Sequence, residues 1–271
     1  MYTLYVVATP IGNLEDISLR ALRILKEVKL IAAEDTRKTS RLLNHYQIAT
    51  PMTSYYEHNK LVKLNRMLSY LEEGDMALVS EAGMPGISDP GYELIVAALE
   101  HGIPVVPIPG ASAVTTALAV SGLATDRFTF LGFLPNKSVG RRRLLENIAA
   151  EKGTLIVLEA PHRVQDSLKD ILATLGDRRI AVCRELTKIH EEIFRGTVSE
   201  ALAHFTAPKG EFTLIIDGNK AESPKELTQE ILKKLHNLRV SGKSAKEAIA
   251  GIAAETGLSK RELYRAWLEK S

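Results

Sequence analysis

The stretch SEAGMPGISDPG, Ser80–Gly91, decides the fold prediction for this chain of 271 residues. It follows the apolar run Met76–Val79 and precedes a helical pattern that begins near Tyr92. Its three glycines permit positive φ and close backbone approach, whereas its two prolines fix φ and remove backbone donors. Such a loop presents a rigid wall of backbone groups, and ligands of open α/β sheets bind at strand ends. A long turn without a function is the alternative.

The composition is typical of a globular protein, with 45% hydrophobic and 25% charged residues. No stretch reaches the ~18 consecutive apolar residues of a membrane span, and the run Tyr2–Ala8 resembles a strand rather than a signal peptide. Cys183 is the only cysteine, which excludes an intramolecular disulfide framework and a cysteine-rich metal site. We therefore expect a cytoplasmic protein without a metal ion, in which Cys183 is a buried structural thiol.

The small net charge of +2 is unevenly distributed. Residues 225–271 contain ten Lys or Arg and six Glu, so the rest of the chain is slightly acidic. A basic tail on a near-neutral body indicates a polyanionic partner. Solvated helix faces would produce the same imbalance.

The first part of the chain alternates apolar strand-like runs with helical patterns. The expected strands are Leu4–Ala8, Leu30–Ala33, Met76–Val79 and Val105–Ile108. The expected helices lie near Ser18–Val28, Thr39–Tyr46, Leu61–Glu72, Tyr92–His101 and Ala111–Ala119. This alternation predicts a mainly parallel sheet with both faces covered.

A second α/β unit is expected from about Arg127. Its predicted strands are Phe128–Phe133, Thr154–Glu159, Ile180–Arg184, Glu192–Phe194 and Glu211–Ile216. Its predicted helices lie near Gly140–Ala150, Arg163–Leu175 and Ser199–Phe205. The later strands are separated by short segments, which favours antiparallel pairing and a mixed sheet.

The sequence pattern predicts a linker at Asp217–Pro224 and helices after it, to the end of the chain. The expected helices are Lys225–Leu238, Ala245–Thr256 and Ser259–Glu269. Ser259 and Glu262 form a capping box, and Gly257 marks a helix stop. The pattern is typical both of a nucleic-acid-binding helix-turn-helix and of a plain helical hairpin. The expected domains are residues 1–118, 119–220 and 221–271.

Seven motifs follow one another along the chain, and each is weak alone. They are VVATPIGN (Val6–Asn13), AAEDTR (Ala32–Arg37), SEAGMPGISDPG (Ser80–Gly91), PIPGASA (Pro107–Ala113), GFLP (Gly132–Pro135), EAPHR (Glu159–Arg163) and CRELTK (Cys183–Lys188). In this order they resemble the bacterial small-subunit ribosomal RNA methyltransferases of the tetrapyrrole-methylase-like class, which use S-adenosylmethionine. The resemblance runs from about Thr3 to Asp217, and the helical tail also fits it.

The resemblance implies two α/β domains of the tetrapyrrole methylase type, the class III methyltransferase fold, plus a small helical C-terminal region. It implies 2′-O-methylation of a cytidine in the decoding region of 16S ribosomal RNA. It also implies a homodimer, with S-adenosylmethionine bound in the cleft between the two α/β domains. The positions that it assigns to the cofactor are Pro10, Gly83, Met84, Pro85, Ile87, Ser112, Ala113, Glu159 and Leu186.

The Gly/Pro loop departs from the broader class at Met84. Tetrapyrrole methyltransferases of this class usually show Gly-Asp-Pro where this chain has Gly83-Met84-Pro85. The change agrees with the ribosomal branch and argues against a tetrapyrrole substrate. The uncharged loop suits an adenosine and a thioether, whereas a triphosphate site requires a lysine and consecutive free N–H groups.

A ribose hydroxyl is a poor nucleophile, so a proton acceptor near it is expected. Glu34 and Asp35 end the second predicted strand, where ligands collect. We predict Asp35 as the general base, with Glu34 as the alternative. Asp35 would otherwise be a helix N-cap. His162 is a further candidate acceptor, or it orders the start of a helix.

Contact with RNA requires cations along the phosphate backbone. The predicted substrate-binding residues are Arg37, Arg163, Arg184 and Lys188, each within or just after a motif. Pairing with local carboxylates is the alternative for them. Lys137 with Arg141–Arg143 is a second basic patch or a solvated helix end, and the candidate base-stacking residues are Phe133, Tyr55 and Tyr56.

Two other functions remain open on the sequence. One is a methyltransferase of the same class that acts on a tetrapyrrole or on a protein side chain. The other is a non-catalytic RNA-binding module that retains the pocket.

Overall fold

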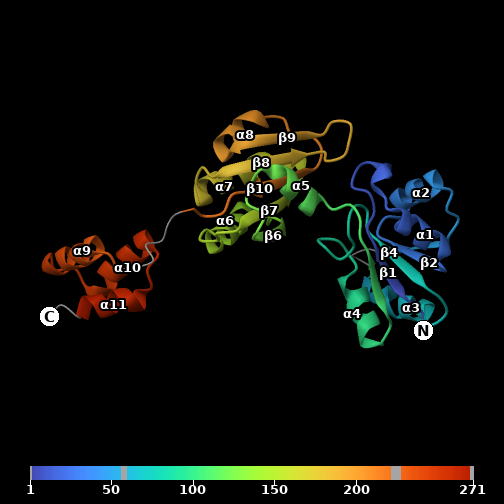
Figure 1. Ribbon diagram of the computed structural model, residues 1–271, viewed down its shortest axis with the longest axis horizontal. Coiled ribbons are helices and arrows are strands. Elements are labelled where there is room, and N and C mark those ends of the chain that lie inside the picture. The colour runs from blue at the N-terminus through green and yellow to red at the C-terminus, as the bar shows by residue number, and fades with distance from the viewer. Residues whose placement is uncertain (1, 56–59, 221–226, 269–271) are drawn as a thin grey trace. The chain divides into compact units, whose positions relative to one another are not determined.

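The computed structural model describes residues 2–55, 60–220 and 227–268 of the chain (Figure 1). It divides into two compact units, Met1–Asn219 and Lys220–Ser271. The larger unit contains two five-stranded sheets. We call residues 2–112, which carry the first sheet, the first lobe, and residues 113–219, which carry the second, the second lobe.

The first sheet is parallel throughout and has the strand order β3-β2-β4-β1-β5. Its strands are β1 (Leu4–Val7), β2 (Leu30–Ala33), β3 (Met52–Ser54), β4 (Met76–Val79) and β5 (Val105–Ile108). Its helices are α1 (Leu19–Glu27), α2 (Thr36–His45), α3 (Lys60–Leu71) and α4 (Tyr92–Glu100), with a 3-10 turn at Leu14–Asp16. The predicted parallel sheet is confirmed.

Both faces of the first sheet are covered, which explains why its strands are short continuous apolar runs. All four residues of β2 and all four of β4 are buried. Alternate residues of these strands pack on opposite sides: Ile31 and Ala33 join the core against α1, and Leu30 and Ala32 join the core on the side of α3 and α4. The edge strand β3 was not predicted, because three residues of mixed polarity carry no strand pattern.

The second sheet is mixed and has the order β6-β7-β10-β8-β9. Its strands are β6 (Phe128–Phe133), β7 (Thr154–Glu159), β8 (Arg179–Arg184), β9 (Glu192–Thr197) and β10 (Phe212–Ile216). Its helices are α5 (Ala113–Ser121), α6 (Ser138–Asn147), α7 (Val164–Leu175) and α8 (Val198–His204), with a 3-10 turn at Pro161–Arg163. The pair β6–β7 is parallel and the other pairs are antiparallel, as the short strand separations predicted.

Helix α5 connects the two lobes, because it follows β5 of the first sheet and packs on the second. One face of the second sheet packs under α6, α7 and α8. The alternate residues on the other face, including Ala181 and Ile215, pack against Ala117 and Leu118 of α5. The boundary expected at residue 118 therefore falls inside a helix.

The smaller unit is a three-helix cluster of α9 (Gln229–Val240), α10 (Ala245–Thr256) and α11 (Lys260–Leu268). Its apolar core includes Ile231, Leu235, Ile252 and Leu263. The Ser259 hydroxyl accepts from Glu262 N, and Gly257 ends α10 with a left-handed φ of 69°. The predicted helix start at Lys225, part of the predicted linker and the predicted end at Glu269 lie outside the described residues. No helix in the described part of the chain is long and apolar enough to cross a membrane.

Candidate cofactor and substrate pocket

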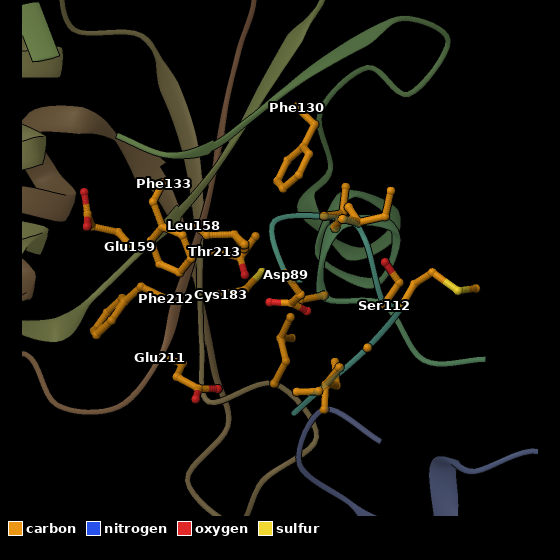
Figure 2. A pocket seen from close by; sticks show the side chains of 18 of the residues that line it. Asp89, Ser112, Phe130, Phe133, Leu158, Glu159, Cys183, Glu211, Phe212 and Thr213 are labelled. Atoms are coloured by element: carbon orange, nitrogen blue, oxygen red, sulfur yellow. The ribbon is translucent and has the colours of Figure 1, made fainter. Parts of the chain in front are cut away.

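A cavity of about 590 Å³ lies between the two lobes, beyond the carboxyl ends of the first sheet (Figure 2). The first lobe lines it with the loops that follow β1, β2, β4 and β5, and the second lobe with α5, β6, β7, β10 and the loop after β8. The lining residues are Ile11, Glu34, Glu81, Ala82, Gly83, Met84, Ile87, Asp89, Ser112, Ala113, Val114, Thr115, Phe128, Phe130, Phe133, Leu158, Glu159, Ala160, Pro161, Cys183, Leu186, Glu211, Phe212 and Thr213. The cavity is therefore mainly apolar, with carboxylates at a few places.

The Gly/Pro loop forms the wall of the cavity that the first lobe provides. Gly83 has a φ of 80° and exchanges backbone hydrogen bonds of 2.9 and 3.0 Å with Thr9. The buried Ser80 hydroxyl donates to the Gly83 carbonyl at 3.3 Å. Gly91 at the start of α4 has a φ of 141°, and a Cβ there would meet the Leu78 side chain at 3.0 Å. These hydrogen bonds and the close packing at Gly91 hold the backbone of the loop in one position.

Small residues bring the start of α5 close to the same wall. Gly110 packs against Ala8, since an added Cβ would lie 3.0 Å from the Ala8 Cβ. Ser112 is the N-cap of α5, and its side chain makes no capping hydrogen bond. Ser112 and Ala113 line the cavity. The PIPGASA motif therefore supplies cavity lining rather than a conventional cap.

Carboxylates from the first lobe make the cavity acidic. Glu34 accepts from Glu81 N at 3.0 Å, and burial raises the pKa of Glu34 above its usual value. Burial, with repulsion from Glu34, raises the pKa of Asp89 to about 6. Lys38 pairs with Glu81. Glu34, Glu81 and Asp89 thus place three carboxylates in the lining that the first lobe provides, an arrangement that suits a cationic ligand.

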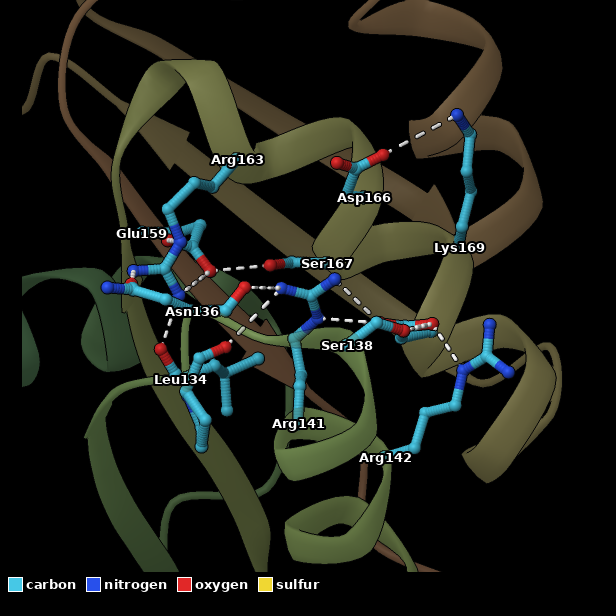
Figure 3. A network of polar contacts seen from close by, with 12 residues as sticks. Leu134, Asn136, Ser138, Arg141, Arg142, Glu159, Arg163, Asp166, Ser167 and Lys169 are labelled. Atoms are coloured by element: carbon cyan, nitrogen blue, oxygen red, sulfur yellow. Dashed lines mark hydrogen bonds and ion pairs between the residues drawn. The ribbon is translucent and has the colours of Figure 1, made fainter.

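Glu159 anchors the wall that the second lobe provides (Figure 3). Its buried carboxylate lies 3.1 Å from Arg163 Nε and accepts from the Ser167 hydroxyl at 2.5 Å. The same Arg163 donates to the Leu134 carbonyl and to the Asn136 side-chain oxygen. Arg163 therefore joins β7 to the segment that follows β6.

Most of the predicted cofactor residues line this one cavity. They are Gly83, Met84, Ile87, Ser112, Ala113, Glu159 and Leu186. Pro10 and Pro85 do not line it: Pro10 precedes the lining residue Ile11, and Pro85 is buried within the loop. Their assignment remains a prediction about the shape of the loops.

The two candidates for the general base have different environments. Asp35 caps α2, because its carboxylate accepts from Arg37 N at 2.8 Å and from Lys38 N. Hydrogen bonds from Arg37 lower the pKa of Asp35, and Asp35 does not line the cavity. Glu34 does line it. Of the two predicted bases, Glu34 lies at the cavity and Asp35 caps a helix, so Glu34 is the better placed candidate.

The four predicted RNA-binding cations all pair with carboxylates, and none lines the cavity. Arg37 pairs with Asp35, Arg163 with Glu159, Arg184 with Glu192, and Lys188 with both Glu185 and Glu211. The pairs of Arg163, Arg184 and Lys188 are partly or fully buried, which favours the alternative of local pairing. The Arg37 side chain is 89% exposed and stays a candidate.

Other expectations about the surface need correction. Arg141 is buried and pairs with Asp170 at 2.6 Å, so it belongs to the interior rather than to a basic patch. Tyr55 is fully buried and is not a stacking residue, whereas Tyr56 lies outside the described residues. His162 is exposed and does not line the cavity. The Cys183 thiol is buried as predicted, and burial raises its pKa to about 11.

Sequence reasoning missed several residues of the cavity. Asp89 lies inside the Gly/Pro motif, so a carboxylate within a ligand-binding loop was a usable signal. Phe128 and Phe130 could be assigned to the cavity only after the structure showed which face of β6 lies toward it. Glu211 and Thr213 reach the cavity because β10 inserts between β7 and β8, and no local pattern predicts that order. In the described part of the chain, no group of three His, Cys, Asp or Glu could hold a metal ion.

Comparison with known proteins assigns the family. The pattern of the Tetrapyrrole (Corrin/Porphyrin) Methylases matches residues 3–202. The chain belongs to this family. The resemblance seen in the seven motifs and the predicted two-lobed fold class are both confirmed.

Several proteins with a curated name are similar to this chain in sequence. A protein of Halalkalibacterium halodurans called ribosomal RNA small subunit methyltransferase I is 51% identical over 98% of this chain and 94% of its own length. A protein of that name from Thermotoga maritima is 48% identical over 81% of this chain and all of its own length. About a fifth of this chain thus has no counterpart in the Thermotoga protein.

A solved structure with the same fold is uroporphyrin-III C-methyl transferase from Thermus thermophilus, complexed with S-adenyl homocysteine. It has a TM-score of 0.58 and 21% sequence identity, over 79% of this chain and 97% of that one. At this identity the likeness concerns the fold alone.

Proposed function

We propose that this chain is an S-adenosylmethionine-dependent methyltransferase that modifies the 2′-hydroxyl of a cytidine in the decoding region of small-subunit ribosomal RNA. The observation that carries the proposal is an acidic, mainly apolar cavity closed on one side by a rigid Gly/Pro loop. The names of the relatives that are about half identical over nearly the whole chain support RNA as the substrate. A cytoplasmic location and a homodimer belong to the same proposal.

The lining fits S-adenosylmethionine in charge, polarity and size. Bound S-adenosylmethionine supplies a methyl group already activated on a sulfonium cation. Glu34 and Asp89 offer negative charge for a cationic ligand, and uncharged residues such as Met84 and Leu186 offer apolar contact for an adenosine. The volume of about 590 Å³ is within the range of ~300–1,000 Å³ for small-molecule sites.

The Gly/Pro loop holds the reacting groups in line. Gly83 is fixed by its hydrogen bonds to Thr9 and Ser80, so its backbone does not move as a long side chain would. Orientation of this kind lowers a barrier by roughly 7–11 kcal/mol. The loop therefore provides the main catalytic contribution that a pre-activated methyl group requires.

Glu34 accepts the proton of the ribose hydroxyl. Burial raises its pKa above the usual value for a glutamate, which strengthens it as a base. Its hydrogen bond from Glu81 N fixes one oxygen and leaves the carboxylate facing the cavity. The negative charge on Glu34 and Asp89 thus serves both proton transfer and attraction of the cationic cofactor.

Contact with the ribosomal RNA backbone is assigned to Arg37 and to the basic helical unit. Arg37 lies in the first turn of α2, three residues after Glu34, and its exposed guanidinium can reach a phosphate. Because a base inside a folded RNA helix is inaccessible, the target nucleotide has to be splayed out. The Thermotoga relative lacks a counterpart for a part of the chain as large as the helical unit, so we assign this unit to affinity rather than chemistry.

Methylation of a tetrapyrrole is the second candidate, favoured by the family description. The experiment that separates them incubates the purified chain with methyl-labelled S-adenosylmethionine and small ribosomal subunits from cells that lack the enzyme. Label should map to the ribose of one cytidine in the decoding region. Label on an added tetrapyrrole, or none on the subunits, would contradict the proposal. Sedimentation of the purified chain tests the homodimer.

A further inference from the structure

Three of the six phenylalanines of the chain face the cavity from one strand. Phe128, Phe130 and Phe133 of β6 all line it. The Phe128 side chain is 44% exposed and that of Phe133 is 53% exposed. By contrast Phe205 is buried in the core of the second lobe, and Phe212, which also lines the cavity, is only 2% exposed. Aromatic rings left open to solvent at a cavity indicate a ligand that covers them.

An irregularity in β6 places the third ring with the other two. Side chains alternate along a strand, so Phe128 and Phe130 share one face and residue 133 belongs on the other. The register between β6 and β7 shifts between Phe130 and Phe133, and Gly132 adopts a φ of 62°. A bulge of this kind turns the next side chain to the opposite face. It brings Phe133 into the cavity.

Polar contacts hold Phe133 there. The carbonyl of the next residue, Leu134, accepts from Arg163, which also binds Asn136 and the buried Glu159 (Figure 3). A Cβ at Gly132 would lie 3.1 Å from the Ser88 hydroxyl oxygen, so β6 also touches the Gly/Pro loop. The exposed Phe133 ring is therefore presented by a fixed backbone.

We propose that Phe133 of β6 forms a stacking surface for the splayed-out base of the target nucleotide. This inference rests on the proposed function and specifies its substrate site: an unpaired nucleobase, bound by its flat face. Phe128 and Phe133, like Ile87 of the Gly/Pro loop, lie at the exposed part of the lining, where a second substrate can enter, whereas Leu186 and Glu159 are buried. Aromatic rings bind unpaired bases in this way, independently of hydrogen bonds.

The test measures steady-state methylation of isolated small subunits together with calorimetric affinity for S-adenosylhomocysteine. Phe133→Ala should raise KM for the subunits about 5- to 100-fold, the usual worth of one stacked base. Affinity for S-adenosylhomocysteine should stay unchanged. Phe133→Trp should retain a KM near the wild-type value, and Phe133→Leu, which keeps apolar bulk without a ring, should behave like Phe133→Ala. Because Phe133 is half-exposed, these variants should fold.

Tyr2→Ala is the matched control, because Tyr2 is also an exposed aromatic residue and does not line the cavity. It should leave KM unchanged. A Phe133→Ala variant with normal KM, or one that loses affinity for S-adenosylhomocysteine instead, would overturn the stacking site while the proposed function stands. Absence of subunit methylation by the wild-type chain would overturn the proposed function itself.

Discussion

The two lobes shape the same cavity by different physical means. In the first lobe the backbone does so: Gly83 and Gly91 adopt positive φ, and Gly110 allows close packing on Ala8. In the second lobe side chains far apart in sequence do so, through the Arg163 contacts to Glu159 and Leu134. Backbone geometry of the first kind is visible in a local sequence motif. Side-chain contacts such as those of Arg163 join residues that become neighbours only in the folded sheet, so the sequence does not show them.

The largest effect should come from breaking the ion pair of the second lobe. Arg163→Met leaves the buried Glu159 carboxylate without its partner, which should lower the free energy of unfolding by about 3–5 kcal/mol in chemical denaturation. The double variant Arg163→Met with Glu159→Gln removes both charges and should recover much of this loss. If Arg163→Met alone were as stable as wild type, the ion pair would not support the wall as we describe.

Removal of the candidate base should come next, as a loss of turnover. Glu34→Gln should lower kcat by about 100-fold or more without changing affinity for S-adenosylhomocysteine, since it removes a proton acceptor and keeps the shape. Because the pKa of Glu34 is raised, kcat of the wild type should fall on acidification at a higher pH than an ordinary Glu would require.

Asp35→Asn is the control for Glu34, since it changes the neighbouring residue that caps α2. It should leave both stability and turnover close to the wild-type values, because Asn is as good an N-cap residue as Asp. If Asp35→Asn reduced kcat as strongly as Glu34→Gln, the base would be Asp35, and the capping assignment would not describe its main role.

A substitution in the Gly/Pro loop should weaken cofactor binding without breaking the second lobe. At Gly83 a Cβ would make only ordinary contacts, at 3.6 Å to Ile11 and 3.7 Å to the Ala111 carbonyl oxygen. Gly83→Val therefore acts through the strain of a branched residue at a φ of 80°, of order 1–3 kcal/mol, and through its methyl groups at the cavity. Affinity for S-adenosylhomocysteine should fall about 10- to 100-fold by calorimetry. Gly102→Val, at a φ of 68° with open space around it, carries the same strain away from the cavity and should leave that affinity unchanged.

Substitution of Asp89 should raise the stability of the protein and weaken its binding of the cofactor. Its folded-state pKa of about 6 lies above the ordinary 3.8, so ionisation between these values costs stability, and the cost persists at neutral pH. Asp89→Asn should stabilise the protein by about 1 kcal/mol at pH 8, after allowance for partial solvent exposure. It should also weaken S-adenosylmethionine binding about tenfold at pH 8, and this difference should vanish well below pH 6. Lower stability of the variant at pH 8 would contradict the assigned environment.

The same contrast between the lobes explains what could be predicted from the sequence. The parallel first sheet followed from its alternating pattern, and the family resemblance assigned Gly83 and Ser112 to the cofactor. Arg141 was misjudged because its partner Asp170 comes from another helix, 29 residues away. Phe128 and Phe130 were not recognised because the sequence does not show which face of β6 lies toward α5 and the cavity. The backbone conformation of a short segment can be predicted from its residue types. Side-chain pairing between segments far apart in the sequence cannot.

The smallest effect should separate an exposed arginine from a largely buried one. Arg37 is 89% exposed, whereas the Arg184 side chain is 27% exposed and lies 2.9 Å from Glu192. Arg37→Ala should weaken binding to small subunits a few-fold and reduce the slope of log affinity against log salt by about one. Arg184→Ala should leave that slope unchanged and lower only stability, by about 1 kcal/mol or less. A wild-type slope for both variants would mean that neither arginine contacts a phosphate, and the cations of α9–α11 would be the next to test.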